Sequence, residues 1–193
     1  MFPDIKPQFS HVERLLADFA KKDKPTVADF NALNTLGGVY DTLDRYRIKA
    51  QSMSRLELEG ENHNSQRLGK NLSRAGEYRP AQGCDAHAIV SGGHRDSIVV
   101  RGVLAWLKMR IDDPHNGCWL PRDWADRLHM PNHLRHAVPH KRIHHANYYQ
   151  WLRNRINPQL IRTPEQLIFA LRTVRVMLQS GNVPPNVMPL TGR

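Results

Sequence analysis

A cluster of histidines in the second half of the chain constrains the fold more than any other feature. Nine of the eleven histidines lie between Asp85 and Tyr149. Neutral imidazole is the commonest protein ligand for a transition metal, and side chains four residues apart on a helix project from the same face. His140 and His144 have this spacing, so the sequence predicts a helix, running from His140 to about Ile156, that presents two ligands to one ion.

Three short patterns follow one another in this window. They are Ala-His-Ala-Ile-Val at 86–90, Asn-Gly-Cys-Trp-Leu-Pro at 116–121, and His-x-x-x-His-x-x-x-Tyr-Tyr at 140–149. In this order they resemble the AHH family of bacterial toxin nucleases, which belongs to the HNH/endonuclease VII superfamily with the ββα-metal (His-Me finger) fold. The resemblance covers about residues 84–156. It implies a mainly α-helical protein in which a small β-hairpin forms part of the nuclease core, with a helical N-terminal extension.

The resemblance also implies the residues of the site. His87 would bind a metal from the first strand, and His140 and His144 would complete the ligand set for one divalent ion, which could be Mg, Mn or Zn. Asn116 would be the asparagine of the HNH pattern, which holds its loop so that the catalytic base faces the ion. Asn-Gly is also a strong tight-turn dipeptide, and the two roles of Asn116 are compatible.

One position departs from the family motif. The motif reads Ala-His-His, and its second histidine is the general base that activates water, whereas this chain has Ala88 there. Loss of a general base lowers a rate by about 100-fold to 10,000-fold, so we expect a protein that binds metal and DNA but is nearly inactive. The alanine is typical of a deliberate knock-out that allows a lethal nuclease to be produced; a natural pseudoenzyme is the alternative. His115, beside Asn116, is a further candidate for the base.

Positive charge is concentrated in the same part of the chain. Residues 1–80 carry 13 Lys and Arg against 11 Asp and Glu, whereas residues 81–193 carry 15 against 7. Thirteen of those fifteen are arginine, whose planar fork matches a phosphate in a bidentate manner. Such a surface attracts a nucleic-acid backbone whatever its base sequence. We expect DNA as the partner, with RNA possible, contacted by Arg95, Lys141 and Arg142.

Periodicity divides the chain into two regions. Apolar residues at intervals of three or four after Phe30 predict an N-terminal helix. Residues 60–83 are rich in Asn, Ser, Arg, Gly and Pro, which is typical of a linker. We therefore expect a helical N-terminal region and linker over 1–80 and the nuclease domain over 81–193. Within that domain the patterns predict strands at 86–90 and 118–120, an inserted helix at 96–110, and a last helix whose capping box is formed by Thr163 and Gln166.

The sequence shows neither a signal peptide nor an apolar run near twenty residues, so we expect no membrane contact and no classical secretion. A toxin of this kind would be secreted by a specialised system, or as part of a larger carrier chain, and delivered to the target-cell cytoplasm. A cognate immunity protein would protect the producer. The N-terminal region would either pack on the nuclease or dock to a delivery partner.

Two other accounts compete with a nuclease. The histidines could form a structural zinc site in a domain that binds nucleic acid or an acidic immunity protein without chemistry. Alternatively, Cys84 or Cys118 could be a nucleophile, although their spacing from the histidines does not favour this. Reversion of Ala88 to histidine separates the first account from a nuclease, because only a nuclease would gain activity.

Overall fold

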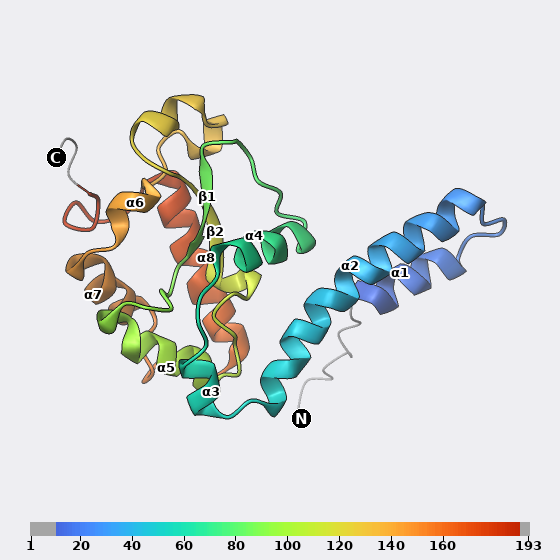
Figure 1. Ribbon diagram of the computed structural model, residues 1–193, viewed down its shortest axis with the longest axis horizontal. Coiled ribbons are helices and arrows are strands. Elements are labelled where there is room, and N and C mark those ends of the chain that lie inside the picture. Colours follow the sequence, from blue (N-terminus) through green and yellow to red (C-terminus); the bar gives the residue numbers. More distant parts are fainter. Residues whose placement is uncertain (1–10, 190–193) are drawn as a thin grey trace, which may run out of the picture. The chain divides into compact units, whose positions relative to one another are not determined.

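The computed structural model describes residues 11–189, and residues 1–10 and 190–193 lie outside this part. Figure 1 shows that the described residues are mostly helical and contain one antiparallel pair of strands. This confirms the expected fold class, a mainly α-helical protein with a small hairpin, consistent with a ββα nuclease core. The helices are α1 (His11–Ala20), α2 (Val27–Ser52), α3 (Arg55–Glu59), α4 (Ser65–Arg74), α5 (Ile98–Trp106), α6 (His140–Ile143), α7 (Ala146–Arg155) and α8 (Pro164–Ser180). The strands are β1 (Cys84–Ala88) and β2 (Gly117–Pro121), and the 3-10 turns are η1 (Arg95–Ser97), η2 (Pro114–Asn116), η3 (Ala125–His129) and η4 (Asn132–Leu134).

The chain forms two compact units, and the division falls between Tyr46 and Arg47. The first unit contains α1 and most of α2, which it includes up to Tyr46. Its two helices pack through apolar side chains, with the rings of Phe19 and Phe30 in edge-to-face contact at 4.9 Å between centroids. The N-terminal part is therefore helical, as its periodicity predicts. Within the described residues, no helix has both the length and the apolar content of a membrane span.

The structure differs from the expected linker over residues 60–83 and from the expected boundary near residue 80. Residues 47–80 belong to the second compact unit, and α4 lies where the linker was expected. The side chain of Asn64 caps α4, while Leu68 and Leu72 are fully buried in the main core. Two leucines four apart in an otherwise polar segment are a weak helical signal, because the segment buries only a narrow stripe.

The hairpin positions the functional part of the second unit. β1 pairs with β2 in an antiparallel register that sets His87 opposite Cys118 and Ala88 opposite Gly117. Both strands lie close to their predicted positions, although β1 begins two residues earlier than expected and ends at Ala88. The connection between them contains α5, as expected for an inserted helix, but α5 stops at Trp106 because the chain takes a left-handed conformation at Lys108 (φ 57°).

Helix α4 covers one face of the hairpin. A Cβ added to Gly69 would lie 3.2 Å from the Trp119 ring and 3.7 Å from the Cβ of Ala86. A Cβ added to Gly117 would lie 2.6 Å from Leu68, so only glycine allows this close approach. Because side chains alternate along a strand, His87 projects from the opposite face, toward Tyr148 of α7.

The helix expected from His140 to Ile156 is interrupted. Helix α6 ends at Ile143, His144 has ψ of 71°, and the extended residue His145 precedes α7. The carbonyl of His145 accepts hydrogen bonds from the backbone N–H groups of Tyr148 and Tyr149, which starts the new helix. His140 and His144 therefore do not share one continuous helical face, although their rings still approach each other. The capping box predicted for α8, with Thr163 and Gln166, is present.

Candidate metal centre

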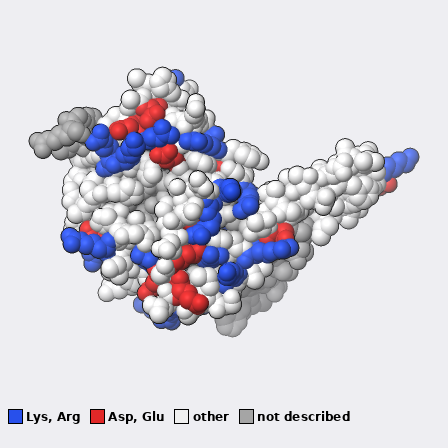
Figure 2. Space-filling view, in the orientation of Figure 1, with Lys and Arg blue, Asp and Glu red and all other residues white. Residues whose placement is uncertain are grey.

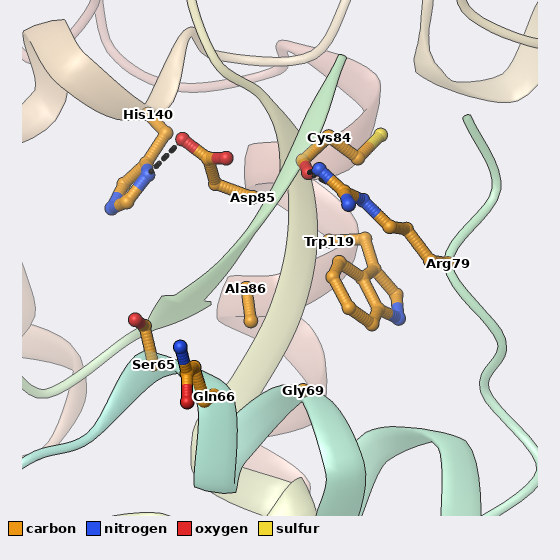
Figure 3. A pocket seen from close by; sticks show the side chains of 9 residues that line it. All are labelled: Ser65, Gln66, Gly69, Arg79, Cys84, Asp85, Ala86, Trp119 and His140. Carbon is orange, nitrogen blue, oxygen red and sulfur yellow. Dashed lines mark hydrogen bonds and ion pairs between the residues drawn. The ribbon is translucent and has the colours of Figure 1, made fainter. Parts of the chain in front are cut away.

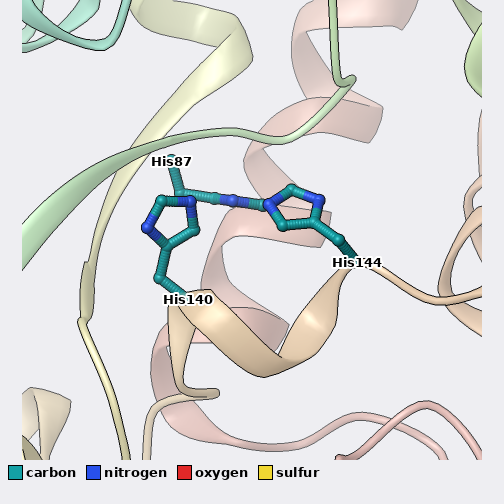
Figure 4. A group of neighbouring side chains, drawn as sticks. All are labelled: His87, His140 and His144. Carbon is teal, nitrogen blue, oxygen red and sulfur yellow. The ribbon is translucent and has the colours of Figure 1, made fainter. Parts of the chain in front are cut away.

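Three histidine rings meet at the end of β1 (Figure 4). His87 comes from β1, His140 from the start of α6, and His144 from the residue after α6. The ring centroids are 5.2 Å apart for His87 and His140, 5.2 Å for His87 and His144, and 5.4 Å for His140 and His144. One ligand nitrogen from each ring lies within 4.8 Å of the others. This triangle is compact enough for one ion to bind all three nitrogens after a small contraction, since Zn–N bonds are about 2 Å long.

Hydrogen bonds fix the orientation of the His87 ring. The Tyr148 hydroxyl donates to the carbonyl of Ile89 at 2.7 Å and lies 3.1 Å from Nε2 of His87. A hydroxyl has a single proton to donate, so Nε2 of His87 must be the donor to the tyrosine oxygen. The lone pair of this ring is therefore on Nδ1, which is buried and has no hydrogen-bond partner among the described residues. A buried nitrogen lone pair without a partner fits a metal ligand.

The other two rings are held in the same way. Nδ1 of His140 donates to the carboxylate of Asp85 at 3.3 Å, and Nδ1 of His144 shares a hydrogen bond of 2.9 Å with the Tyr149 hydroxyl. Metal-binding histidines usually have their second nitrogen bonded to a carboxylate or another polar group, which fixes the tautomer and the ring orientation. Nε2 of His140 and Nε2 of His144 are the nitrogens available to an ion.

The site favours uncharged imidazoles. Burial lowers the pKa of His87 well below its ordinary value, and the neighbouring His140 and His144 lower it further. Burial and the nearby His140 likewise lower the pKa of His144 to about 4. The rings of His87 and His144 are therefore neutral at physiological pH, which is the form that binds a cation. The donor set and its geometry fit one divalent ion with further positions left for water or a phosphate oxygen.

Comparison with known families identifies this region. Residues 68–162 match the sequence model of AHH, described as a nuclease family of the HNH/ENDO VII superfamily with conserved AHH. This part of the chain belongs to the AHH family. No curated protein and no solved structure matches the chain.

The family match confirms the resemblance read from the three motifs and extends it upstream into α4. The AHH region therefore carries a nuclease function, acts on nucleic acid, and uses a divalent metal as HNH/ENDO VII nucleases do. The His87, His140 and His144 cluster is, among the described residues, the one group of this kind that could hold the ion.

The alanine in the AHH motif of this chain lies on the side of the hairpin that faces α4. Ala88 pairs with Gly117, which packs against Leu68 of α4. Only 5% of Ala88 is exposed. Strand alternation places its methyl on the opposite face from His87. A histidine at this position of the motif would thus project from the α4 side of β1.

Asn116 is buried, and its side chain forms hydrogen bonds to the backbone of the segment that follows β1. Its side-chain amide donates to the carbonyls of Val90 and Ile111, at 3.2 and 2.8 Å, and its Oδ1 accepts from the backbone N–H of Val90 at 2.9 Å. These bonds use the whole amide for backbone contacts. Asn116 can therefore hold the segment after His87 in place, and it is also the last residue of the turn before β2.

The candidate nucleic-acid contacts lie on the surface. Arg95 is 90% exposed and lies 3.7 Å from Asp96. Lys141 and Arg142 directly follow His140 on α6 and are exposed, with Nε of Arg142 donating to Asp123 at 3.3 Å. Figure 2 shows that, on the face in view, the Lys and Arg side chains lie in several groups with Asp and Glu side chains among them.

A pocket of about 450 Å³ adjoins the histidine cluster (Figure 3). His140 and Asp85 form one side of it, and α4 forms another. Arg79 also lines the pocket, and its guanidinium donates to the carbonyl of Cys84 at 2.8 Å. The pocket is polar on the side of the cluster and apolar at Ala86 and Trp119.

Sequence reasoning missed the residues that orient the rings. Asp85 bonds both His140 and Arg122 at 3.3 Å. Its position two residues before His87, on the same face of β1, is the sequence signal that could have identified it. Tyr148 and Tyr149 belong to the recognised pattern, but their role in holding His87 and His144 depends on contacts between distant segments.

The surroundings of Cys84, Cys118 and His115 make these three side chains unsuited to act as a nucleophile or a general base. Burial raises the pKa of Cys84 to about 11 and that of Cys118 to about 12, so neither thiol provides a thiolate at neutral pH. Burial lowers the pKa of His115 to about 4, and the charges acting on this ring come from Asp113 and from arginines rather than from the histidine cluster. His115 is therefore a poor substitute for the motif's base.

Proposed function

We propose that this AHH domain is a metal-dependent endonuclease that hydrolyses phosphodiester bonds of DNA. The observation that carries the proposal is the convergence of three imidazoles, each with one nitrogen held by a polar partner and one directed to the shared centre. His87, His140 and His144 would hold one divalent ion, Mg, Mn or Zn. When bound, the ion supplies a Lewis acid that polarises the phosphate and neutralises charge on the leaving 3′ oxygen.

The residues around the cluster have distinct roles in this proposal. Tyr148, Asp85 and Tyr149 orient the three rings, and Asn116 holds the segment that follows His87. Lys141 and Arg142 lie next to His140 and would bind the phosphate backbone without reading the base sequence. The pocket beside His140 has room for the nucleotide next to the scissile phosphate.

Ala88 sets the expected rate. The AHH motif provides its general base at this position, and a methyl group cannot accept a proton. We propose that the enzyme is therefore impaired, by about 100-fold to 10,000-fold relative to a form with histidine at 88. A structural metal site without chemistry is the second candidate, and Ala88 is the observation that favours it.

The biological role we propose is that of an antibacterial toxin. A strongly basic chain with a formal charge of +10 is suited to neutralisation by an acidic immunity protein. Delivery to the cytoplasm of a target cell would depend on a specialised secretion system or a carrier chain. The helical N-terminal unit, which contains α1 and most of α2, is the part that we propose as the docking element for delivery.

Cleavage assays test the proposal directly. The protein and its Ala88→His variant are incubated with plasmid DNA or with structured RNA, with Mg, Mn or Zn and with or without a chelator. We expect slow metal-dependent nicking of DNA by the unaltered protein and faster nicking by the variant. If chelation lowers the melting temperature but neither form cleaves any nucleic acid, the structural-site account is correct.

A further inference from the structure

A second histidine and aspartate pair joins His63, which precedes the residues matched by the AHH family model, to Asp112, which lies within them. His63 lies in the turn before α4, and its Nδ1 is 2.5 Å from Oδ1 of Asp112. Asp112 is fully buried, and its Oδ2 accepts from Nε of Arg67 at 2.6 Å and from the backbone N–H of Asn64 at 3.0 Å. A buried carboxylate with these donors is held in one orientation.

The Asp112 carboxylate defines the tautomer of His63. It accepts the hydrogen bond, so the proton of the neutral imidazole is on Nδ1 and the lone pair is on Nε2. The His63 side chain is 27% exposed, and Nε2 has no hydrogen-bond partner among the described residues. The same arrangement of carboxylate, imidazole and available Nε2 orients the general base in hydrolytic triads.

His63 lies against the loop that leaves the metal centre. A Cβ added to Gly92 would be 2.6 Å from the Cβ of His63 and 3.0 Å from its backbone nitrogen. Two residues later in this loop, the His94 ring stacks on Tyr149 at 4.1 Å, and Tyr149 bonds His144.

His63 lies on the same side of β1 as Ala88. Ala88 projects toward α4, and His63 immediately precedes Asn64, the residue that caps α4. His63 is thus at the end of α4 that is near the C-terminal end of β1, on the side from which the second histidine of an AHH motif would project. The methyl of Ala88 supplies no base from β1 itself, so an imidazole acting on this side has to come from another segment.

We propose that His63, oriented by Asp112, is the general base that acts in place of the histidine missing at position 88. The inference rests on the proposed nuclease function. As the water oxygen bonds to phosphorus, its proton passes to Nε2 of His63, and the bond from phosphorus to the 3′ oxygen breaks, with solvent water protonating the leaving oxygen. Asp112 is a positioning residue that stabilises the imidazolium formed in this step.

The first test compares His63→Gln with the unaltered protein in plasmid nicking at saturating metal. We expect nicking to fall at least tenfold, while metal affinity by calorimetry and DNA affinity by fluorescence anisotropy change less than twofold. His133→Gln is the matched control, because His133 is an exposed histidine in the same unit. Adding Ala88→His to His63→Gln should restore activity to the level of Ala88→His alone.

Two further measurements distinguish a catalytic role of His63 from a structural one. Exogenous imidazole should restore nicking to His63→Ala, which a purely structural role of His63 does not predict. In ¹⁵N NMR spectra of the metal-free protein, the His63 ring should show a protonated Nδ1 and an unprotonated Nε2, and Asp112→Asn should change this tautomer.

The outcomes separate the inference from the function. If His63→Gln nicks DNA as fast as the unaltered protein, the inference is overturned and the nuclease stands. The same holds if the unaltered protein is inactive but Ala88→His cleaves DNA. If neither the unaltered protein nor Ala88→His cleaves any nucleic acid with any of the three metals, the proposed function and the inference both fall.

Discussion

The hydroxyl of Tyr148 accepts a hydrogen bond from Nε2 of His87 at 3.1 Å, inside the core, where both side chains are fully buried. The same hydroxyl donates to the carbonyl of Ile89, the residue after β1. This hydrogen bond sets the tautomer of His87, a candidate metal ligand that lies 61 residues from Tyr148 in the sequence. It links β1 to α7, so a tyrosine of the third sequence pattern orients the histidine of the first.

Tyr148→Phe tests this link. Phenylalanine keeps the ring but removes the acceptor for Nε2 of His87, so the imidazole loses its fixed tautomer. We expect metal affinity to fall about 10-fold to 100-fold and the free energy of unfolding to fall by about 1 to 3 kcal/mol, because the Ile89 carbonyl also loses its donor. Calorimetric titration with Zn and urea unfolding measure the two effects. Unchanged affinity in a folded variant would mean that His87 does not bind the ion through Nδ1.

Asp85→Asn addresses the carboxylate that orients His140. The amide cannot accept as strongly from Nδ1 and can present its N–H₂ group instead, so His140 becomes a less basic ligand. We expect metal affinity to decrease about 10-fold to 100-fold, as measured by competition with a chromogenic chelator. Asp123→Asn is the control, since Asp123 bonds Arg142 and the backbone N–H of Trp124 but none of the three histidines. Equal affinities for the two variants would remove Asp85 from the metal centre.

The stability of the metal-free protein should depend on His115 in acid. Burial lowers the pKa of His115 from 6.5 to about 4, so the unfolded chain binds more protons than the folded chain between these values. Stability is complete above about pH 6.5 and is lost as the pH falls toward 4, with His115 contributing about 2 to 3 kcal/mol. His115→Gln cannot take up this proton, so its urea midpoint should fall less between pH 7.5 and 5.

The exposed His133 is the control for this measurement. His133→Gln should keep the pH dependence of the unaltered protein. Some dependence should persist in His115→Gln as well, because His87 and His144 also have lowered pKa values and act in the same direction. A slope in His115→Gln equal to that of the unaltered protein would show that His115 is not buried as described.

Lys141 and Arg142 should contribute to DNA affinity through charge. Each phosphate contact that is lost reduces the slope of log affinity against log salt by about 0.9. We therefore expect the double variant, Lys141→Ala with Arg142→Ala, to bind DNA of different sequences uniformly more weakly and to lower the slope by about 2. Arg153→Ala removes an exposed charge of α7 and is the control. Anisotropy titrations at several salt concentrations would contradict the assignment if both variants gave the slope of the unaltered protein.

The sequence predicts what short-range spacing encodes. His87, His140 and His144 could be proposed as a set because a motif order and a spacing of four residues marked them. Their orientation could not be predicted, because the bonds from Asp85 to His140 and from Tyr148 to His87 join segments 55 and 61 residues apart. The break at His144 was missed for a related reason: a spacing of four fits a continuous helix equally well as a short turn followed by a new helix.

The segment before the hairpin could not be predicted from its amino-acid composition. Polar residues surround Leu68 and Leu72, so the sequence of α4 has the character of a linker, and its helical state depends on burial of these two leucines against Gly117 of β2. Because α4 was not expected, the pairing of His63 with Asp112 across 49 residues could not be foreseen either.

Ala88→His is the variant in which activity and stability should change in opposite directions. The Ala88 methyl is buried on the face that α4 covers, where Gly117 already allows a close approach of Leu68. A larger ring there must displace its neighbours, at a cost of about 1 to 3 kcal/mol in the free energy of unfolding. If the ring turns toward the end of β1, it restores the base of the AHH motif, and metal-dependent nicking of plasmid DNA should rise at least 100-fold. Ala86→Ser, on the same face of β1, is the control: it should lose stability without gaining activity. A folded Ala88→His protein that binds metal but nicks DNA no faster than the unaltered chain would show that position 88 does not face the reacting phosphate.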